Sequence, residues 1–146
     1  MRFYLLLFIS FCGFSQEVFK PLEQRKEFRP LKIERALKAD GHLDEAEWAQ
    51  APTVNLDFQV EPFQGRKASF NSTVKLLYNH QYLYVAAILQ DSVGKNAYRA
   101  PNLKRDYVFS DNESFGISLD GFNDKRNAIV LQSNPYGAQR DLLAFD

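Results

Sequence analysis

The sequence has very little cysteine, histidine and tryptophan, and no excess of charge of either sign. Of its 146 residues, one is cysteine, two are histidine and one is tryptophan, while 18 lysines and arginines balance 18 aspartates and glutamates. One cysteine excludes an intramolecular disulfide framework and a multi-cysteine metal site. The zero formal net charge gives no basis for nucleic acid or an anionic membrane surface as a partner.

Motifs of catalysis are also lacking. His42 and His80 do not have the spacing of metal ligands, and the chain contains no G-x-S-x-G, Gly-rich phosphate loop or H-E-x-x-H. The paired carboxylates of glycoside hydrolysis are defined by a spatial separation of about 5 to 10 Å, so the sequence leaves them open. We therefore predict that this module is non-catalytic.

An apolar run occupies the N-terminus. Residues 1–15 read MRFYLLLFISFCGFS, one arginine followed by an apolar run too short to span a bilayer as a mature helix. Gly13 and Ser15 place small residues at the −3 and −1 positions of a cut before Gln16. The run predicts a secretory signal peptide, whose removal also removes Cys12. We expect an exported protein located in the periplasm, the outer membrane or the extracellular space.

Aromatic residues are abundant, with 13 phenylalanines and 7 tyrosines, and this bias favours strands over helices. Residues 16–35 are polar and contain two prolines, which predicts a linker with a strand near Leu31–Ile33. Residues 53–63 alternate loosely between apolar and polar side chains and contain Pro62, which is typical of an edge strand.

Two β-hairpins give the clearest signal. The first, STVKLLYNHQYLYVAAILQDS (72–92), alternates on either side of an Asn-His-Gln turn. Its second strand is apolar on both faces and is predicted to be central and covered on both sides. The second hairpin joins ESFGISLDGF to NAIVLQSN through NDKR, and another turn follows at NPYG (134–137). Between the hairpins, residues 92–111 form a long polar loop of a length that is usually functional or flexible.

The pattern as a whole is that of an all-β domain. Five or more short strands with closely spaced turns and one short helix predict an antiparallel, jelly-roll-like β-sandwich over residues 36–146. The stretch DLLAFD (141–146) is apolar and has no partner in this pattern. We therefore expect the sandwich to be incomplete, truncated at its C-terminal end, and the chain to be the N-terminal part of a longer protein.

Carboxylates surround the only tryptophan in DGHLDEAEWAQAP (40–52). Asp44 and Glu47 have the spacing of a capping box, in which the two side chains cap each other's backbone amides. Leu43 and Trp48 have the spacing of a hydrophobic staple. These patterns predict a short helix with Trp48 as a core anchor, and they outweigh the alternative of an acid/base cluster beside an aromatic sugar platform.

The long loop carries a candidate sugar site. Guanidinium groups donate to hydroxyls, and tyrosine rings pack on the apolar face of a sugar. The alternative is an ordinary solvated loop. The candidate residues are Tyr98, Arg99, Arg105 and Tyr107.

An acidic series surrounds the same loop and consists of Asp106, Asp111, Glu113 and Asp120. Calcium takes six to eight oxygen ligands, which loops of this kind supply. The spacing is not that of an EF-hand. From the residues alone, turn-forming and solvated acids are the favoured alternative.

Four segments in one order resemble a known family. ADGHLDEAEWAQAP, VKLLYNHQYLYVAAILQDS, RDYVFSDNESFGISLDGFND and NPYGAQRD resemble family 9 carbohydrate-binding modules, over residues 39–146. In particular, the chain is similar to the version at the N-terminus of large envelope proteins that have a predicted C-terminal outer-membrane barrel. The resemblance implies a β-sandwich, recognition of sugar chain ends, bound calcium, and frequent fusion to glycoside hydrolases.

Specific expectations follow from the resemblance. If the family's calcium is retained, Asp106, Asp111 and Asp120 are the expected ligands, and the ion would be structural. Such modules can hold a sugar between two exposed tryptophans, whereas this chain has only Trp48, so a tyrosine ring would have to offer the flat face. The hypothesis is a secreted or envelope carbohydrate-binding module that holds a poly- or oligosaccharide near a glycoside hydrolase during carbohydrate breakdown. The alternative is a periplasmic or outer-membrane structural or interaction domain attached to a membrane β-barrel.

Overall fold

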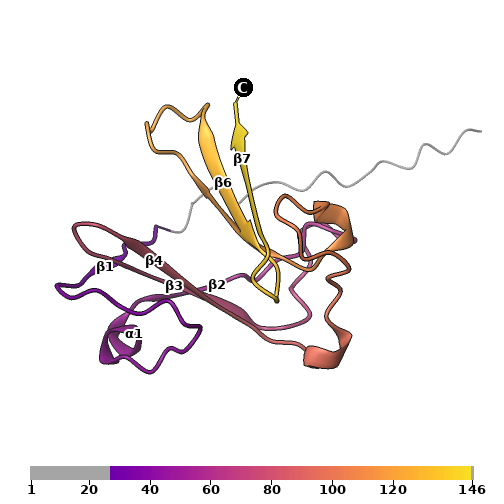
Figure 1. Ribbon diagram of the computed structural model, residues 1–146, viewed down its shortest axis with the longest axis horizontal. Coiled ribbons are helices and arrows are strands. Elements are labelled where there is room, and N and C mark those ends of the chain that lie inside the picture. The colour runs from indigo at the N-terminus through magenta and orange to yellow at the C-terminus, as the bar shows by residue number, and fades with distance from the viewer. Residues whose placement is uncertain (1–26, 146) are drawn as a thin grey trace, which may run out of the picture.

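Two sheets make up most of the structure, a computed structural model that describes residues 27–145. The predicted signal peptide and Cys12 lie outside the described residues. One sheet contains β1 (Leu31–Lys32), β2 (Thr53–Asn55), β3 (Ser72–Tyr78) and β4 (Leu83–Leu89), and the other β5 (Phe115–Leu119), β6 (Ala128–Ser133) and β7 (Gln139–Ala144) (Figure 1). The helices are α1 (Ala46–Gln50) and the 3-10 turns η1 (Lys95–Ala97) and η2 (Phe109–Asp111).

The helices are all short. Within residues 27–145, none of them has the length and apolar character needed to cross a membrane.

The first sheet is organised around β3. The β3–β4 pair is antiparallel and in register from Ser72 opposite Leu89 to Tyr78 opposite Leu83, so the predicted hairpin is confirmed. β2 pairs antiparallel with β3 through three residues and β1 pairs in parallel at Leu31 and Lys32, which confirms the strand near Leu31–Ile33. The predicted edge strand at 53–63 is realised only as β2, because the chain then leaves the sheet in an excursion to residue 71 that is closed by a bridge between Phe58 and Lys67.

The prediction that β4 is central is wrong. Among the described strands β4 pairs only with β3, and Leu83, Ile88 and Leu89 are 43%, 45% and 50% exposed. Its two apolar faces have a different cause. Ala86 belongs to the core beneath the sheet, whereas Val85 lines a cavity against the second sheet. The strand is apolar on both sides because it lies between two layers, not because it has two neighbours.

The most buried core lies between the first sheet and α1. It consists of Ile33, Trp48, Ala51, Leu77 and Ala86, each at most 6% exposed. The prediction of Trp48 as a core anchor is thereby confirmed. Lys75 Nζ also donates to the Trp48 carbonyl oxygen at 2.7 Å, which ties the helix to β3. Because Ile33 belongs to this core, packed structure extends into the segment predicted to be a linker.

The predicted capping box is not formed. The N-cap residue of α1 is Glu45, whose side chain makes no capping hydrogen bond. Glu47 instead accepts from Arg35, with Oε1 2.5 Å from Nε and Oε2 2.8 Å from an Nη atom. A bidentate ion pair is stronger than a bond to one neutral amide, so the carboxylate turns to the guanidinium. Leu43, the proposed staple partner, is 37% exposed.

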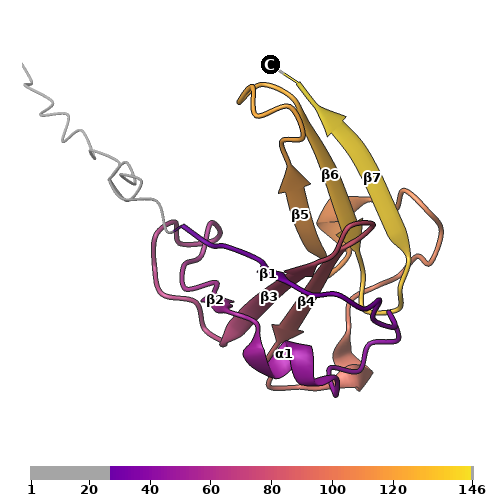
Figure 2. The same cartoon turned by 90° about the vertical axis from the view of Figure 1, so that its left-hand side faces the viewer.

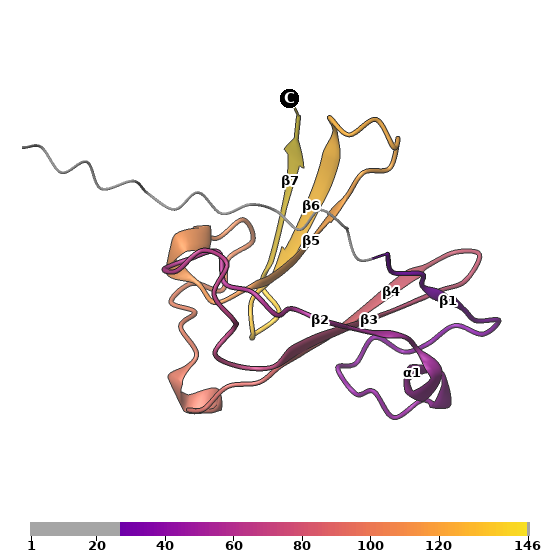
Figure 3. The same cartoon turned by 180° about the vertical axis from the view of Figure 1, so that it is seen from behind.

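The second sheet is antiparallel in the order β5–β6–β7, and the predicted second hairpin is confirmed. The stretch DLLAFD does have a partner, because β7 pairs with β6 from Gln139 to Ala144. The second sheet rises away from the first, on the side opposite α1 (Figures 1, 2 and 3). The all-β, two-sheet architecture with one short α-helix confirms the predicted fold class.

Candidate functional site

A cavity of about 950 Å³ opens where the connection from β4 to β5 meets the β6–β7 turn. We call it the loop cavity. Residues from the end of β4, from the connection and from the start of the turn all reach it. Its lining consists of Gly41, Phe70, Ala87, Leu89, Gln90, Asp91, Lys95, Tyr98, Glu113, Ser114, Phe115, Ser133, Asn134 and Pro135.

Aromatic rings form one part of the lining. Phe70, Tyr98 and Phe115 contribute from three separate segments. Tyr98 is half-buried and packs edge-on against Tyr136, with ring centroids 6.2 Å apart and an interplanar angle of 72°. The ring of Tyr98 is therefore held by a neighbour, and a held ring offers a fixed flat surface at little cost in side-chain entropy.

Polar side chains form the other part. The Asp91 carboxylate accepts hydrogen bonds from the backbone amides of Val93 and Gly94 at 3.0 and 3.1 Å, so its position is fixed by its own turn. The side chains of Lys95 and Glu113 are exposed and have no hydrogen-bond or ion-pair partner within residues 27–145. They are free to bind a ligand.

The hydroxyl of Ser114 lies beside the cavity. Its Oγ atom is buried and makes no hydrogen bond to any described residue. Buried polar groups are nearly always hydrogen-bonded, because leaving one unpaired is costly.

The lining of the loop cavity as a whole combines rings, carboxylates, an ammonium group and amides. This is the chemistry that recognises a polyhydroxylated ligand.

The four predicted sugar-binding residues are not gathered in one site. Tyr98 lines the loop cavity, and the Arg99 carbonyl accepts from the Glu113 amide at 2.7 Å next to it. Arg105 lines a different cavity. Tyr107 is only 2% exposed, with its hydroxyl unpaired among the described residues, so its ring faces the interior. Of the four, only Tyr98 presents its side chain to the loop cavity.

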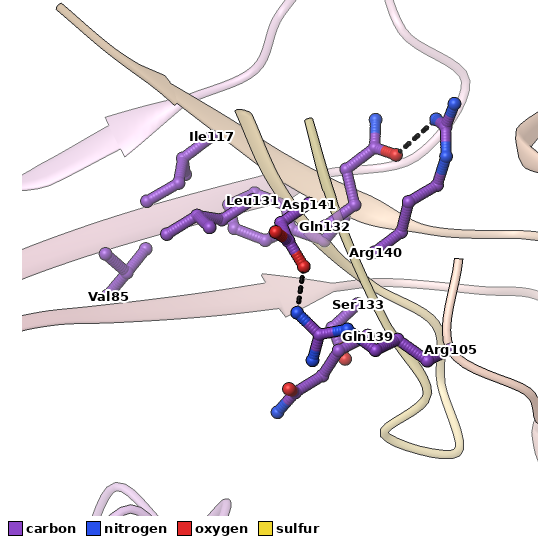
Figure 4. Close-up of a pocket in the computed structure, with 10 residues that line it drawn as sticks. Val85, Arg105, Ile117, Leu131, Gln132, Ser133, Gln139, Arg140 and Asp141 are labelled. Atoms are coloured by element: carbon purple, nitrogen blue, oxygen red, sulfur yellow. Dashed lines mark hydrogen bonds and ion pairs between the residues drawn. The ribbon is translucent and has the colours of Figure 1, made fainter. Parts of the chain in front are cut away.

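The second cavity, of about 480 Å³, lies between the two sheets. Figure 4 shows Val85 of β4 opposite Ile117 and Leu131 of the second sheet, with an ion pair between Arg105 and Asp141 beside them. The Arg105 guanidinium is thus already occupied. The inter-sheet cavity has an apolar floor and internally paired charges, so the loop cavity is the better candidate for a sugar.

The three predicted calcium ligands are held separately. Asp120 accepts from three backbone amides in the β5–β6 connection, Asp106 interacts with Arg105 and the Asp141 amide, and Asp111 accepts from Ser110. In the part of the chain that the structure describes, no three acidic, histidine or cysteine side chains form a group able to hold a metal ion. As arranged, these residues do not fit a calcium site, and calcium stays a prediction of the resemblance.

Several cavity residues were not singled out by the sequence. Gln90 and Asp91 follow β4 directly, and Asn134 begins the NPYG turn. Polar residues at these positions are the ordinary residues of turns. One feature of the sequence could have pointed to them. Two hairpins separated by a long loop bring the ends of their strands to one edge of the molecule.

The all-β, two-sheet domain uses its long connection to build a cavity of rings and polar side chains, an arrangement suited to binding a ligand. The carbohydrate family 9 binding domain-like family matches residues 39–134, which is more than half of the chain, and the chain belongs to this family. No curated protein and no solved structure gives a significant match to the chain.

Proposed function

We propose that the protein is a carbohydrate-binding module that binds a poly- or oligosaccharide in the loop cavity. The observation that carries the proposal is the half-buried ring of Tyr98 beside the free side chains of Lys95 and Glu113, in a chain of this family. The C–H groups of a pyranose pack on a flat ring, while its hydroxyls take hydrogen bonds from the polar lining. The volume, about 950 Å³, lies within the range of small-molecule sites.

Affinity electrophoresis tests this proposal. The full chain is run in native gels containing xylan, hydroxyethyl cellulose, galactomannan or pectin, beside gels without polysaccharide. We expect retardation by at least one polysaccharide and about tenfold weaker binding by Tyr98→Ala, since loss of one stacking contact is worth about 1.4 kcal/mol.

The matched control is Tyr82→Ala. Tyr82 is 55% exposed and precedes β4 at the end far from the loop cavity, so its removal should leave retardation unchanged. If no polysaccharide retards the wild-type chain, or if both tyrosine variants lose binding equally, the loop cavity is not the sugar site.

We further propose that the module is exported and serves polysaccharide breakdown beside a glycoside hydrolase. The support is the N-terminal apolar run with its small residues before Gln16. The chain is expressed in cells able to export it, and the N-terminus of the product is sequenced. We expect a mature chain that begins at Gln16, and an intact N-terminus would contradict export. If the chain is folded but none of the polysaccharides retards it in the gel, the alternative is favoured, namely an interaction domain attached to a membrane barrel.

A further inference from the structure

Asn134 connects two parts of the molecule that build the loop cavity. It is only 5% exposed. Its Oδ1 accepts from the backbone amides of Tyr136 and Ala138 at 3.1 and 2.9 Å, within the β6–β7 turn. Its Nδ2 donates to the Asn102 carbonyl oxygen at 3.4 Å and to Asn112 Oδ1 at 3.5 Å, in the long connection. One buried amide therefore shapes the turn with its oxygen and holds the connection with its nitrogen.

Both parts carry elements of the site. The turn carries Tyr136, which packs against the ring of Tyr98. The connection supplies Tyr98 and Glu113, and its second anchor, Asn112, directly precedes Glu113. We infer that Asn134 is a positioning residue of the ligand site, which keeps the long connection against the β6–β7 turn so that the loop cavity is formed before ligand arrives. This inference rests on the proposed function and adds to it a residue that does not itself have to touch the sugar.

The expected size of the effect follows from pre-organisation. A ligand that binds only the ordered connection has an apparent affinity reduced by the fraction of molecules in which that connection is ordered. If loss of the nitrogen's hydrogen bonds leaves the connection ordered in about one molecule in ten, binding weakens about tenfold. The turn, held by the oxygen, should not change.

Asn79 provides a matched control within the same chain. It is 8% exposed and begins the turn between β3 and β4. Its Oδ1 accepts from the amides of Gln81 and Tyr82, and its Nδ2 donates to the Arg35 carbonyl oxygen and the Tyr84 hydroxyl, both at 3.4 Å. The same amide chemistry thus occurs at the far end of β4, about 20 Å of strand away from the loop cavity.

The experiment compares Asn134→Asp with Asn79→Asp in the full chain. Aspartate keeps the accepting oxygen of each turn but cannot donate, so each variant loses the tether and gains one negative charge, and Asn79→Asp controls for that charge at an equally buried site. Hydrogen exchange read by mass spectrometry is expected to accelerate over residues 99–113 in Asn134→Asp and to stay unchanged in its β6–β7 turn. Retardation by whichever of xylan, hydroxyethyl cellulose, galactomannan or pectin binds the wild type should weaken about tenfold in Asn134→Asp and stay unchanged in Asn79→Asp.

Separate outcomes overturn separate claims. Unchanged exchange over residues 99–113, or accelerated exchange with full affinity, overturns the positioning role while the proposed function stands. A wild-type chain that no polysaccharide retards overturns both. Should Asn134→Asp not fold, Asn112→Ala removes one of the two acceptors on the other side of the tether. It must then show the same faster exchange and weaker binding, and a variant with normal affinity overturns the inference.

Discussion

At the scale of single residues, Glu47 shows how a charged partner replaces a helix cap. The hydrogen bonds from Arg35 hold the pKa of the Glu47 carboxyl below its usual value, and the same contact raises the pKa of the Arg35 guanidinium. A carboxylate whose pKa is lowered on folding stabilises the folded state above its unfolded pKa. It loses that contribution as pH falls through the folded-state pKa. The link between α1 and the segment before it therefore depends on pH.

Replacing Glu47 by glutamine should expose this dependence. We expect Glu47→Gln to lower the free energy of unfolding at neutral pH, and the difference from wild type to disappear as pH falls below the ordinary glutamate pKa of about 4.3 and through the lowered value. Urea unfolding at a series of pH values measures it. Glu34→Gln, at an exposed pair with Lys32, is the control and should show little effect. A difference that is the same in acid would mean that charge is not its cause.

Replacing Trp48 should lower the stability of the fold without changing sugar affinity. Its side chain is 6% exposed in the core beneath the first sheet, so Trp48→Ala should lower the free energy of unfolding by about 3 to 5 kcal/mol. Trp48→Phe should cost less, because it keeps a ring in the same space. Denaturant unfolding gives the stability, and titration of the folded fraction should give unchanged affinity for polysaccharide. Lost affinity with unchanged stability would place Trp48 in the binding site.

At the scale of elements, the β5–β6 connection depends on two aspartates. Asp120 accepts from the amides of Phe122, Asp124 and Lys125. The backbone amide of Asn127 is the main cause that lowers the pKa of the Asp124 carboxyl. Lys125 has a φ of 61°, a left-handed conformation that is rare outside glycine and Asn or Asp. The side-chain oxygens compensate for a turn that the backbone does not favour.

Removing the first of these carboxylates tests its role. Asp120→Ala should lower the free energy of unfolding by about 1 kcal/mol, both in calcium and in chelator, because the three hydrogen bonds need no metal. Asp111→Ala, which removes one contact with Ser110, should cost less. Melting curves in millimolar calcium and in chelator give both values. A loss confined to calcium would assign Asp120 to a metal site.

The predictable elements are those whose pattern is local. Both hairpins and the helix with Trp48 follow from alternation and spacing within about twenty residues, and the structure has them. The prediction of a capping box was wrong because Arg35, the partner that Glu47 binds instead, lies twelve positions before it in the sequence. Helix spacing alone does not reveal such a partner. The prediction that β4 is central was wrong because a strand between two layers has the same apolar sequence pattern as a strand between two neighbouring strands.

The candidate site was less predictable, for a related reason. A long loop with tyrosines and arginines marks a region, but which side chains turn inward depends on what packs against it. Tyr98 reaches the loop cavity, whereas Tyr107 is buried and Arg105 pairs with Asp141. Asn134 could not be recognised, because an asparagine before proline is an ordinary turn residue, and its second role arises from segments far away in sequence.

At the scale of the whole molecule, burial is unequal between the two sheets. The core cluster belongs entirely to β1, α1, β3, β4 and their neighbouring residues. In the second sheet, Ile129, Leu131 and Leu143 are 48%, 43% and 69% exposed. The free energy needed to open part of a protein locally is higher where more apolar side chains are buried.

The rate of amide hydrogen exchange should therefore differ between the two sheets. We expect the amides of β3 to exchange most slowly and those of β5 and β7 to exchange faster, because few buried side chains hold the second sheet to the first. Peptide-level exchange in native buffer measures both. Equal protection of all the strands would show that the two sheets open as one cooperative unit.

The location of the single tryptophan determines which signals optical methods can detect. Trp48 belongs to α1, which lies beneath the first sheet, on the side opposite the second sheet (Figure 2). Its emission should therefore report loss of the packed interior, with no background from other indoles because the chain has one tryptophan. A ligand in the loop cavity would leave that emission unchanged. A fluorescence titration without signal would then say nothing about occupancy, and an indole introduced in place of Tyr136 would supply the missing reporter.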